Sequence, residues 1–503
     1  MRNRAVGDPP QRATLRGLLT RVPRALRWLA GDPDRSAAVE TALEALAAGA
    51  AGAAILAEKP GRRRLAMAVL PTGERIFVKH YPPPERARWR TRFERWLGLG
   101  PDAREWRMLV RLRAANVAVP EPLAHVALPR GDRMLVTRFV PGEPLLAALQ
   151  RPARERRALL GSVGALVARL HAAGVIHRDL HAANILVGES GPLLLDLQAA
   201  LPLRWRAAQR RDLGELDASL APRVSRADRI RVAAAALGVA PPFDARASRQ
   251  LAGVARAGRA RARAHWKSRM RRSLRPGRQY ARVALGGGAG LRLREVPQAS
   301  VEGWLSGASS GAGVEVRHFR APGILAALAD ALRGSAARRA WRAGHALRVR
   351  GIAADRPLAF LEWRRLGLPV RSALLLEPLP ALGADAGRAD PAGFLDALAR
   401  LLGALHARDL SHGALDASAL RRARTGELGI GGLDAVHCEA RSDAQRLAEL
   451  ERLAVPLASW LAGVPESRRR QACLLYATRA PFRDPVSAAE RLRRALAVSA
   501  ARS

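Results

Sequence analysis

The alternation of apolar and polar positions divides the chain into strands and helices before any motif is considered. Residues 63–81, RRLAMAVLPTGERIFVKHY, alternate on either side of a PTG turn, which predicts two paired strands. Residues 102–117 repeat their apolar positions at helical spacing, with Asp102 as the expected N-cap. The apolar stretch at 133–145 predicts a buried strand that leads into a loop.

A long helix is predicted over residues 155–174, where one face is apolar and Gly174 marks the end. The strand GPLLLDLQ follows a short loop, and Asp196 lies at its end. Residues 254–282 hold the densest run of cationic side chains, which predicts a last helix followed by a linker. The GGGAG stretch at 286–290 would belong to that linker.

The pattern then recurs at a nearly constant spacing. VKHY (78–81) returns as VRHF (316–319), and LHAAGVIH (170–177) returns as LHARDLSH (405–412). Trp106 likewise has a counterpart in a later helix, Trp341. Because the period has the size of a domain, the sequence predicts two copies of one domain rather than a solenoid.

Composition adds a strong basic character. The chain has 503 residues, with 85 Lys and Arg against 44 Asp and Glu and a formal net charge of +41. The length predicts two or three domains. The excess of arginine fits either a GC-rich genome or a polyanionic partner such as anionic lipid, phosphorylated glycolipid or nucleic acid, and composition does not choose between them.

Cysteine content and hydropathy place the chain in the cytoplasm. Two cysteines, Cys438 and Cys473, exclude a disulfide framework and indicate a reducing compartment. The basic N-terminus is not followed by a long apolar run, which argues against a signal peptide. The apolar run at 45–57 is too short to span a bilayer. Residues 1–45 predict basic helices that either pack on the protein or lie at a membrane interface.

The first copy supplies, in order, the parts that phosphoryl transfer needs. Lys79, in mid-strand, can present its ammonium to nucleotide phosphates, and Glu105 on the next helix could pair with it. Asp179 would accept or orient the proton of the acceptor hydroxyl. Asn184 and Asp196 would bind Mg²⁺, with Asp196 as the main ligand. Lys79 or Glu105 alone would be an ordinary surface charge, but HRDLHAAN fits H-R-D-L-x-x-x-N at every specified position.

On these motifs the chain resembles the protein-kinase-like superfamily. More narrowly, it resembles the lipopolysaccharide kinase family of Gram-negative bacteria, whose members phosphorylate Kdo or heptose in the inner core. The resemblance covers roughly residues 55–275 and includes AREWRML, HRDLHAANILV and RWRAAQRRDLGELDASL. It implies ATP and Mg²⁺ as cofactors and gives the five residues above the roles just described. It also implies that the backbone near Thr137, Arg138 and Phe139 receives the adenine.

The chain departs from the general kinase pattern in informative ways. No G-x-G-x-x-G precedes Lys79, because EKPGRRRLAM has one glycine and three arginines, so arginine side chains could partly replace the backbone cradle for phosphates. Asp196 is followed by Leu-Gln instead of Phe-Gly. Little chain separates Asp196 from the RRDLGELDASL helix, and A-P-E is absent there. This favours a sugar or small-molecule hydroxyl over a peptide as the acceptor.

The second copy lacks most of these groups. Arg317 stands at the position of Lys79, and Ala340 at that of Glu105. Alanines, Ala414 and Ala419, replace Asp179 and Asn184, while Asp434 is expected to match Asp196. A copy without the orienting carboxylate should not transfer phosphate. It would serve binding, scaffolding or control, or be a structural remnant.

The sequence therefore predicts an α+β protein with two tandem protein-kinase-like domains, each with a small β-rich N-lobe and a larger helical C-lobe. The expected boundaries are a basic helical segment at 1–45, an active domain at 46–270 and a degenerate domain at 271–503.

The expected activity is ATP-dependent phosphorylation of a lipopolysaccharide core sugar at the inner face of the inner membrane, by a cytoplasmic protein that could bind the anionic surface peripherally. The alternatives are a protein Ser/Thr kinase, an aminoglycoside-type phosphotransferase, or a non-catalytic nucleotide- or lipid-binding scaffold. No aromatic-interleaved basic stretch supports nucleic-acid binding. The acceptor is a glycolipid or sugar, and the sequence leaves the oligomeric state open.

Overall fold

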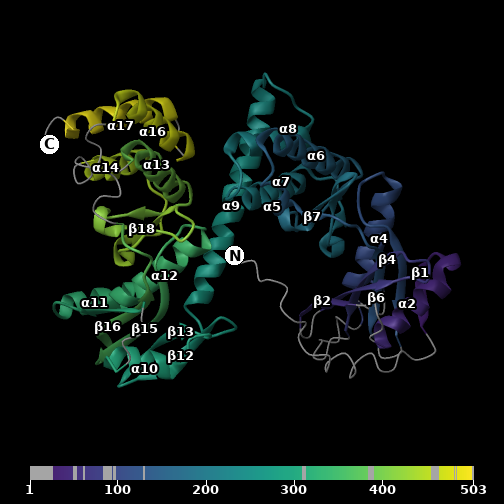
Figure 1. The fold of residues 1–503 in the computed structure, drawn as a ribbon, viewed down its shortest axis with the longest axis horizontal. Coiled ribbons are helices and arrows are strands. Elements are labelled where there is room, and N and C mark those ends of the chain that lie inside the picture. The colour runs from purple at the N-terminus through teal and green to yellow at the C-terminus, as the bar shows by residue number, and fades with distance from the viewer. Residues whose placement is uncertain are drawn as a thin grey trace. The chain divides into compact units, whose positions relative to one another are not determined.

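A computed structural model describes residues 26–48, 54–59, 63–82, 93, 98–128, 131–308, 313–382, 390–454, 464–480, 482 and 484–500. The chain divides into two compact units, Met1–Ala262 and Arg263–Ser503, and each is described by itself (Figure 1). Each unit combines helices with small antiparallel sheets, as an α+β protein requires.

The first unit begins with a six-stranded antiparallel sheet in the order β1-β5-β6-β4-β3-β2. Its strands are β1 (Arg27–Gly31), β2 (Ala54–Lys59), β3 (Arg63–Val69), β4 (Arg75–Tyr81), β5 (Pro122–Ala127) and β6 (Arg133–Arg138). The strands predicted around the PTG turn are β3 and β4, and they pair with Leu65 opposite Lys79. The predicted strand at 133–145 is the shorter β6.

Helices cover both faces of this sheet. On one face, α2 (Ser36–Ala48) buries Val39 and Leu43 in a cluster that also contains Val78 of β4. On the other, Leu112 of α4 (Pro101–Ala114) belongs to a separate cluster with Leu135 of β6. Successive side chains of a strand point to opposite faces. Lys79, which follows Val78, therefore points to the face that α4 covers.

Two local predictions in this region were wrong. Arg27–Gly31 is a strand and not part of a basic helix, and Trp28 within it donates from Nε1 to Glu40 Oε1 of α2 at 2.6 Å. Trp28 is thus a packing residue, while residues 1–25 lie outside the described residues. The N-cap of α4 is Gly100, and Asp102 is instead buried and 2.9 Å from His125 Nε2.

The remainder of the first unit is mainly helical. Its helices are α5 (Leu145–Ala148), α6 (Ala153–Ala172), α7 (Arg206–Leu220), α8 (Arg226–Leu237) and the first part of α9 (Ala245–Ser273). Five short strands lie in the segments before and between these helices: β7 (Glu143–Pro144), β8 (Val175–Ile176), β9 (Ile185–Gly188), β10 (Gly191–Leu194) and β11 (Leu201–Pro202).

The predicted long helix is α6, and the chain leaves it through Gly174 with φ +70°. A glycine also lets α6 approach α8 closely. A Cβ on Gly164 would lie 2.5 Å from the carbonyl oxygen of Val232 in α8. The two helices therefore pack backbone to backbone at this point.

The second unit has a five-stranded antiparallel sheet in the order β12-β13-β15-β16-β14. Its strands are β12 (Tyr280–Leu285), β13 (Gly288–Leu293), β14 (Glu315–Arg320), β15 (Arg356–Arg365) and β16 (Leu368–Glu377). The GGGAG stretch, predicted to lie in a linker, contributes the turn and the first residues of β13 in the β12–β13 hairpin.

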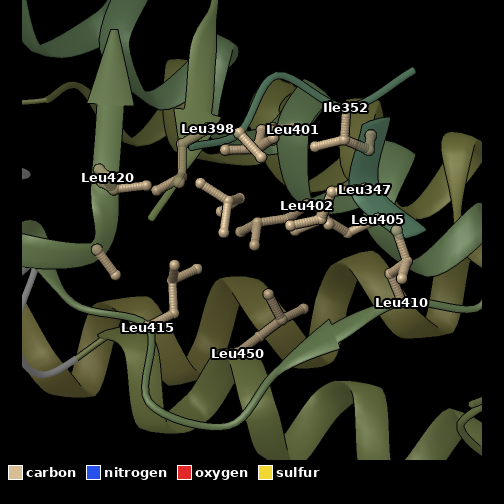
Figure 2. Packing of buried hydrophobic residues seen from close by; sticks show 14 of the residues in the cluster. Leu347, Ile352, Leu398, Leu401, Leu402, Leu405, Leu410, Leu415, Leu420 and Leu450 are labelled. Atoms are coloured by element: carbon tan, nitrogen blue, oxygen red, sulfur yellow. The ribbon is translucent and has the colours of Figure 1, made fainter. Parts of the chain in front are cut away.

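Helices and short strands complete this unit. The helices are α10 (Gln298–Ser306), α11 (Ile324–Arg333), α12 (Ala336–Val349), α13 (Pro391–Ala407), α14 (Asp443–Ala454), α16 (Glu466–Arg479) and α17 (Pro485–Ala500). The short strands are β17 (Ser411–His412), β18 (Leu420–Arg422), β19 (Leu428–Ile430) and β20 (Val436–His437). Leucines of α12, α13, α14 and β18 pack into one core (Figure 2). Within the described residues, no helix is long and apolar enough to cross a membrane.

Candidate functional site

The first part of the site is a buried ion pair between β4 and α4. Lys79 Nζ lies 2.6 Å from Glu105 Oε1, and the two side chains are 12% and 3% exposed. Tyr81 donates its hydroxyl to the other carboxylate oxygen, Glu105 Oε2, at 2.6 Å. Burial, together with the charge of Glu105, raises the pKa of Tyr81 far above its usual value, so this phenol stays a donor. Glu105 therefore holds Lys79 in one position.

Asp196, which is far from Lys79 and Glu105 in the sequence, is the third charged residue of this cluster. It follows β10 with a left-handed backbone, φ 58°, and its Oδ1 lies 3.9 Å from Lys79 Nζ. Arg63, the first residue of β3, donates to both carboxylate oxygens, at 3.0 and 2.9 Å. Burial favours the neutral acid, but the hydrogen bond from Arg63 and the charge of Lys79 outweigh it and lower the pKa of Asp196. Asp196 is thus an anion surrounded by cations.

A buried carboxylate on α7 holds the loop that carries Asp179. Asp212 Oδ2 accepts from the backbone amide of His177 at 2.6 Å, and Oδ1 accepts from that of Arg178 at 2.8 Å. Arg178 has a left-handed φ of 64°, which is uncommon for a residue with a side chain. His177 is fully buried, and its Nε2 lies 3.0 Å from the carbonyl oxygen of Leu195. Asp212 and His177 thus shape the loop.

Asp179 and Asn184 occupy the two ends of this loop. The Asp179 side chain is 44% exposed, with His181 Nε2 3.7 Å from its Oδ2. The Asn184 side chain donates from Nδ2 to the carbonyl oxygen of Asp179 at 2.9 Å. This bond uses the amide nitrogen and directs the amide oxygen elsewhere, so Asn184 keeps an acceptor atom. The exposed Asp179 carboxylate can reach a substrate hydroxyl.

The expected adenine site lies at the end of β6. Thr137 is buried, and Arg138 pairs with Glu74 and, at 3.1 Å, with Glu121. The amide of Arg138 donates to the carbonyl oxygen of Glu121, and the amide of Phe139 to that of Arg75.

Those two amides are therefore not available to a base. Among the described residues, the next amide, that of Val140, has no hydrogen-bond partner. The adenine contact at Thr137–Phe139 stays a prediction. The sequence did not single out the Val140 amide, because strand pairing, which decides which amides are used, is not visible in the sequence.

Magnesium chemistry fits this donor set only in part. Within the described residues, no group of three or more His, Cys, Asp or Glu side chains could hold a metal ion. Mg²⁺ in nucleotide-dependent enzymes is usually held by one or two carboxylates, waters and substrate phosphates. The Asp196 carboxylate and the Asn184 amide oxygen match that need once a nucleotide supplies the remaining oxygens.

The second unit has a loop with the same hydrogen bonds. His412 Nε2 lies 3.3 Å from the carbonyl oxygen of Gly431, as His177 Nε2 lies 3.0 Å from that of Leu195. The His412 amide donates to the buried carboxylate of Glu449 at 2.8 Å, as the His177 amide does to Asp212. These bonds make Gly431 the counterpart of Leu195.

This register corrects one predicted equivalence. Asp196 and Gly432 both precede a short 3₁₀ turn and have φ values of 58° and 56°. Gly432, and not Asp434, therefore stands at the position of Asp196, and Asp434 corresponds to Gln198. The sequence comparison matched Asp434 to Asp196 because both residues follow a short apolar strand. The register of such a strand is fixed by its pairing, which the sequence does not show. Arg317 does lie 3.8 Å from Asp434, but its nearest carboxylate is Glu315, at 2.6 Å.

In the second unit, the backbone amide at the position that corresponds to Val140 is bonded to a side chain. Val136 pairs with Val78 and Leu375 with Val316, so Leu379 is the counterpart of Val140. The Leu379 amide donates to Oδ1 of Asp355 at 2.9 Å, and Arg421 Nε lies 3.4 Å from the same oxygen.

Asp355 is fully buried. Burial raises its pKa, and the carboxylate is fixed between an amide and a guanidinium. An amide that is already bonded in this way is not available to an incoming base.

Several of these groups were not singled out from the sequence. Arg63 and Tyr81 lie in the strands that were predicted, and alternation along β3 and β4 places them on the Lys79 face. Asp212 lies in the RRDLGELDASL helix, but its role depends on a contact with a loop far away in sequence.

Comparison with known proteins bears on the first unit. No curated protein matches the chain significantly. Residues 50–235 match the sequence model of the lipopolysaccharide kinase (Kdo/WaaP) family, and this range contains Lys79, Glu105, Asp179, Asn184 and Asp196. The resemblance expected from the motifs is confirmed over this range. Over residues 50–235, the chain is therefore similar to the lipopolysaccharide kinase (Kdo/WaaP) family.

Proposed function

We propose that the first unit transfers the γ-phosphate of ATP to a hydroxyl of a lipopolysaccharide core sugar, Kdo or heptose, with Mg²⁺. The observation that carries this proposal is the convergence of Lys79, Glu105 and Asp196 within hydrogen-bond or ion-pair distance, beside the loop that holds Asp179. The match of residues 50–235 to the lipopolysaccharide kinase (Kdo/WaaP) family model supports a phosphotransferase.

Each residue has a chemical task in this proposal. Lys79, fixed by Glu105, binds the nucleotide phosphates, and Asp196 with Asn184 binds Mg²⁺, which offsets phosphate charge. The acceptor oxygen bonds to the γ-phosphorus as the bond to the bridging oxygen of ADP breaks. Asp179 orients the acceptor hydroxyl and takes its proton. The adenine accepts a hydrogen bond from the Val140 amide, next to Thr137, Arg138 and Phe139.

The acceptor is a glycolipid because the segment after Asp196 leaves little chain to dock a peptide. The 3₁₀ turn that begins at Leu197 leads through β11 directly to α7 at Arg206. We place the protein in the cytoplasm, peripherally at the inner face of the inner membrane, where arginines meet anionic groups. A protein Ser/Thr kinase and an aminoglycoside-type phosphotransferase use the same chemistry and differ in the acceptor.

We also propose that the second unit is a degenerate copy of the first. The strand order β14-β16-β15 repeats β4-β6-β5, and both units hold a histidine loop by a buried carboxylate. Alanines or glycine stand where the first unit has Asp179, Asn184 and Asp196. The hairpin β12–β13 pairs with β15 and not with β14, so no described strand lies beside Arg317 as β3 lies beside Lys79. This unit would bind or support other parts without transferring phosphate.

The proposal is tested by following phosphate into acceptors. Purified protein is incubated with radiolabelled ATP, Mg²⁺ and core glycolipid, with a mixed protein substrate in a parallel reaction. Label should enter the glycolipid, and Asp179→Asn should lower the rate by about 10² to 10⁴ while ATP still binds. Label in protein would favour the protein kinase, and label in an aminoglycoside the small-molecule enzyme.

Equal, negligible turnover by wild type and Asp179→Asn with every acceptor would favour the non-catalytic scaffold. Mass spectrometry of lipopolysaccharide from cells with and without the protein provides the independent measurement. A core that lacks one phosphate only in the deletion strain is the expected result.

A further inference from the structure

The contact between Arg63 and Asp196 joins the start of β3 to the end of β10. Leu65 pairs with Lys79 across β3 and β4, and Arg63 lies two residues before Leu65 on the same face. The guanidinium of Arg63 therefore points into the space that Lys79 and Asp196 share. Its two bonds to the carboxylate form the bidentate arrangement that is the strongest ion-pair geometry for arginine.

This pair conflicts with the state in which the enzyme would work. Both oxygens of Asp196 are engaged by Arg63, and the hydrogen bond to Asp196 raises the pKa of the Arg63 guanidinium further. Under the proposed function, at least one of those oxygens must bind Mg²⁺. A divalent cation and a guanidinium on one carboxylate repel each other, so Arg63 must move away when Mg²⁺ binds.

We propose that Arg63 is a phosphate-binding residue that also keeps Asp196 occupied while no nucleotide is bound. When MgATP enters, Mg²⁺ takes the carboxylate, and the guanidinium turns to the phosphate oxygens. Its planar donors suit phosphate as well as carboxylate. The inference rests on the proposed function and deepens it, because it assigns the residue that recognises the polyphosphate.

The local sequence supports an arginine in this role. A glycine-rich loop binds phosphates with backbone amides, whereas the sequence that leads into β3 and includes Arg63, EKPGRR, has a single glycine. β3 is also the strand that pairs with β4, so Arg63 and Lys79 approach the phosphates from adjacent strands. In the second unit the strand that carries Arg317 has no such described neighbour, and Gly432 replaces Asp196.

The chain offers a matched control in the next residue. Side chains alternate along β3, so Arg64 lies on the same face of the sheet as Ala66 and Ala68, which pack in the cluster that contains residues of α2. It therefore points away from the face of Arg63 and Lys79. Arg64→Ala removes the same charge from the same strand. It should leave metal and nucleotide binding unchanged.

The test compares full-length wild type with Arg63→Ala, Arg63→Lys and Arg64→Ala, after thermal unfolding shows that each is folded. Mn²⁺ binding without nucleotide is followed by electron paramagnetic resonance, and MgATP binding by calorimetry. Arg63→Ala should bind Mn²⁺ several-fold more tightly than wild type, because Asp196 is released. It should bind MgATP about tenfold more weakly, the factor expected for loss of one charge-assisted bond of about 1.5 kcal/mol. Arg63→Lys should fall between the two.

The outcomes separate this inference from the function on which it rests. If wild type binds MgATP, Asp196→Asn removes its metal dependence, and Arg63→Ala behaves like Arg64→Ala, then the role of Arg63 is wrong and the kinase proposal stands. If wild type binds neither Mn²⁺ nor MgATP, both are wrong. If Arg63→Ala binds MgATP more weakly but binds Mn²⁺ as wild type does, then Arg63 does not block Asp196 in the absence of nucleotide, and that part of the proposal is wrong.

Discussion

Asp212 has two backbone partners and no direct access to substrate, so it acts by shaping the loop that carries Asp179. It fixes Arg178 in a left-handed conformation through the amides of His177 and Arg178. Such strained positions persist only where surrounding contacts enforce them.

We expect Asp212→Ala to lower the free energy of unfolding by about 1–3 kcal/mol, because the buried amide of His177 and the partly buried amide of Arg178 lose their acceptor. The rate of phosphate transfer should fall while MgATP affinity changes little, since Lys79 and Asp196 do not contact Asp212. Urea unfolding and initial rates measure the two effects. Glu189→Ala, in an exposed turn, is the control, and an equal loss of rate in that variant would contradict this role for Asp212.

His345 links stability to pH in the second unit. It packs edge-on against Trp341 and Tyr280, and burial with the nearby charges of Arg348 and Arg356 lowers its pKa to about 3. The folded state thus keeps His345 neutral, while the unfolded chain takes up a proton near pH 6.5. Stability from this group is full above pH 6.5 and is lost as the pH falls below it.

The resulting prediction concerns the slope of stability against pH. Between pH 7.5 and 5.5, His345 should lower the free energy of unfolding by about 1.4 kcal/mol. His345→Phe keeps an aromatic ring and removes the titrating group, so its urea midpoint should depend less on pH than that of wild type. Identical slopes for the two proteins would show that the pKa of His345 is the same in the folded and unfolded states, which would contradict the prediction.

At the scale of elements, the packing of α6 on α8 depends on one glycine. A Cβ on Gly164 would meet the Val232 carbonyl oxygen, whereas nothing lies within 4 Å of a Cβ on Gly161 of the same helix. Gly164→Ala should therefore lower the free energy of unfolding by about 1–3 kcal/mol, as overpacking does. Gly161→Ala should raise it by about 0.5–1 kcal/mol through helix propensity. Calorimetric unfolding of both variants decides, and effects of the same sign would contradict the packing.

Elements with a clear period were predictable, and contacts between distant elements were not. The strands β3 and β4 and the helix α6 follow directly from apolar spacing, and Lys79, Asp179 and Asn184 follow from motif order. Arg27–Gly31 was predicted as helix, because its role as a partner for β5 is visible only in the sheet.

Register was the second limit at this scale. Asp434 was matched to Asp196 because both follow a short apolar strand, and hydrogen bonds to His412 show that Gly432 holds the position. Short strands carry too few side chains to fix register from sequence alone. The bidentate contact of Arg63 with Asp196 joins residues far apart in the chain, and no local sequence pattern predicts it.

At the scale of the whole molecule, the proposed function assigns one complete set of catalytic groups to the chain, in the first unit. We expect one MgATP per chain, since Asp355 occupies the Leu379 amide in the second unit. Lys79→Ala should abolish nucleotide binding measured by calorimetry, and Arg317→Ala, its counterpart in the second unit, should leave it intact. A stoichiometry of two, or loss of binding in Arg317→Ala, would contradict this assignment.

The net charge of +41 belongs to the whole molecule as well. If it serves attraction to an anionic surface, binding to vesicles that contain anionic lipid should weaken steeply between about 0.05 and 0.5 M salt, because screening shortens the reach of each charge. Sedimentation with neutral vesicles is the control. Binding that does not respond to salt or to lipid charge would favour genome composition as the cause.

The carboxylate of Asp355 has a consequence for the history of the second unit. Under the proposal that the second unit is a degenerate copy, a side chain of the protein satisfies the amide at the base position, and selection no longer preserves residues whose only purpose was to bind a nucleotide. Reversal would need a new residue at Asp355 and oxygen-bearing side chains at Ala414, Ala419 and Gly432 together, and no single step among these restores turnover. Loss of activity in the second unit would therefore be irreversible in practice, and its sheet and helices would remain under selection only for a structural or binding role.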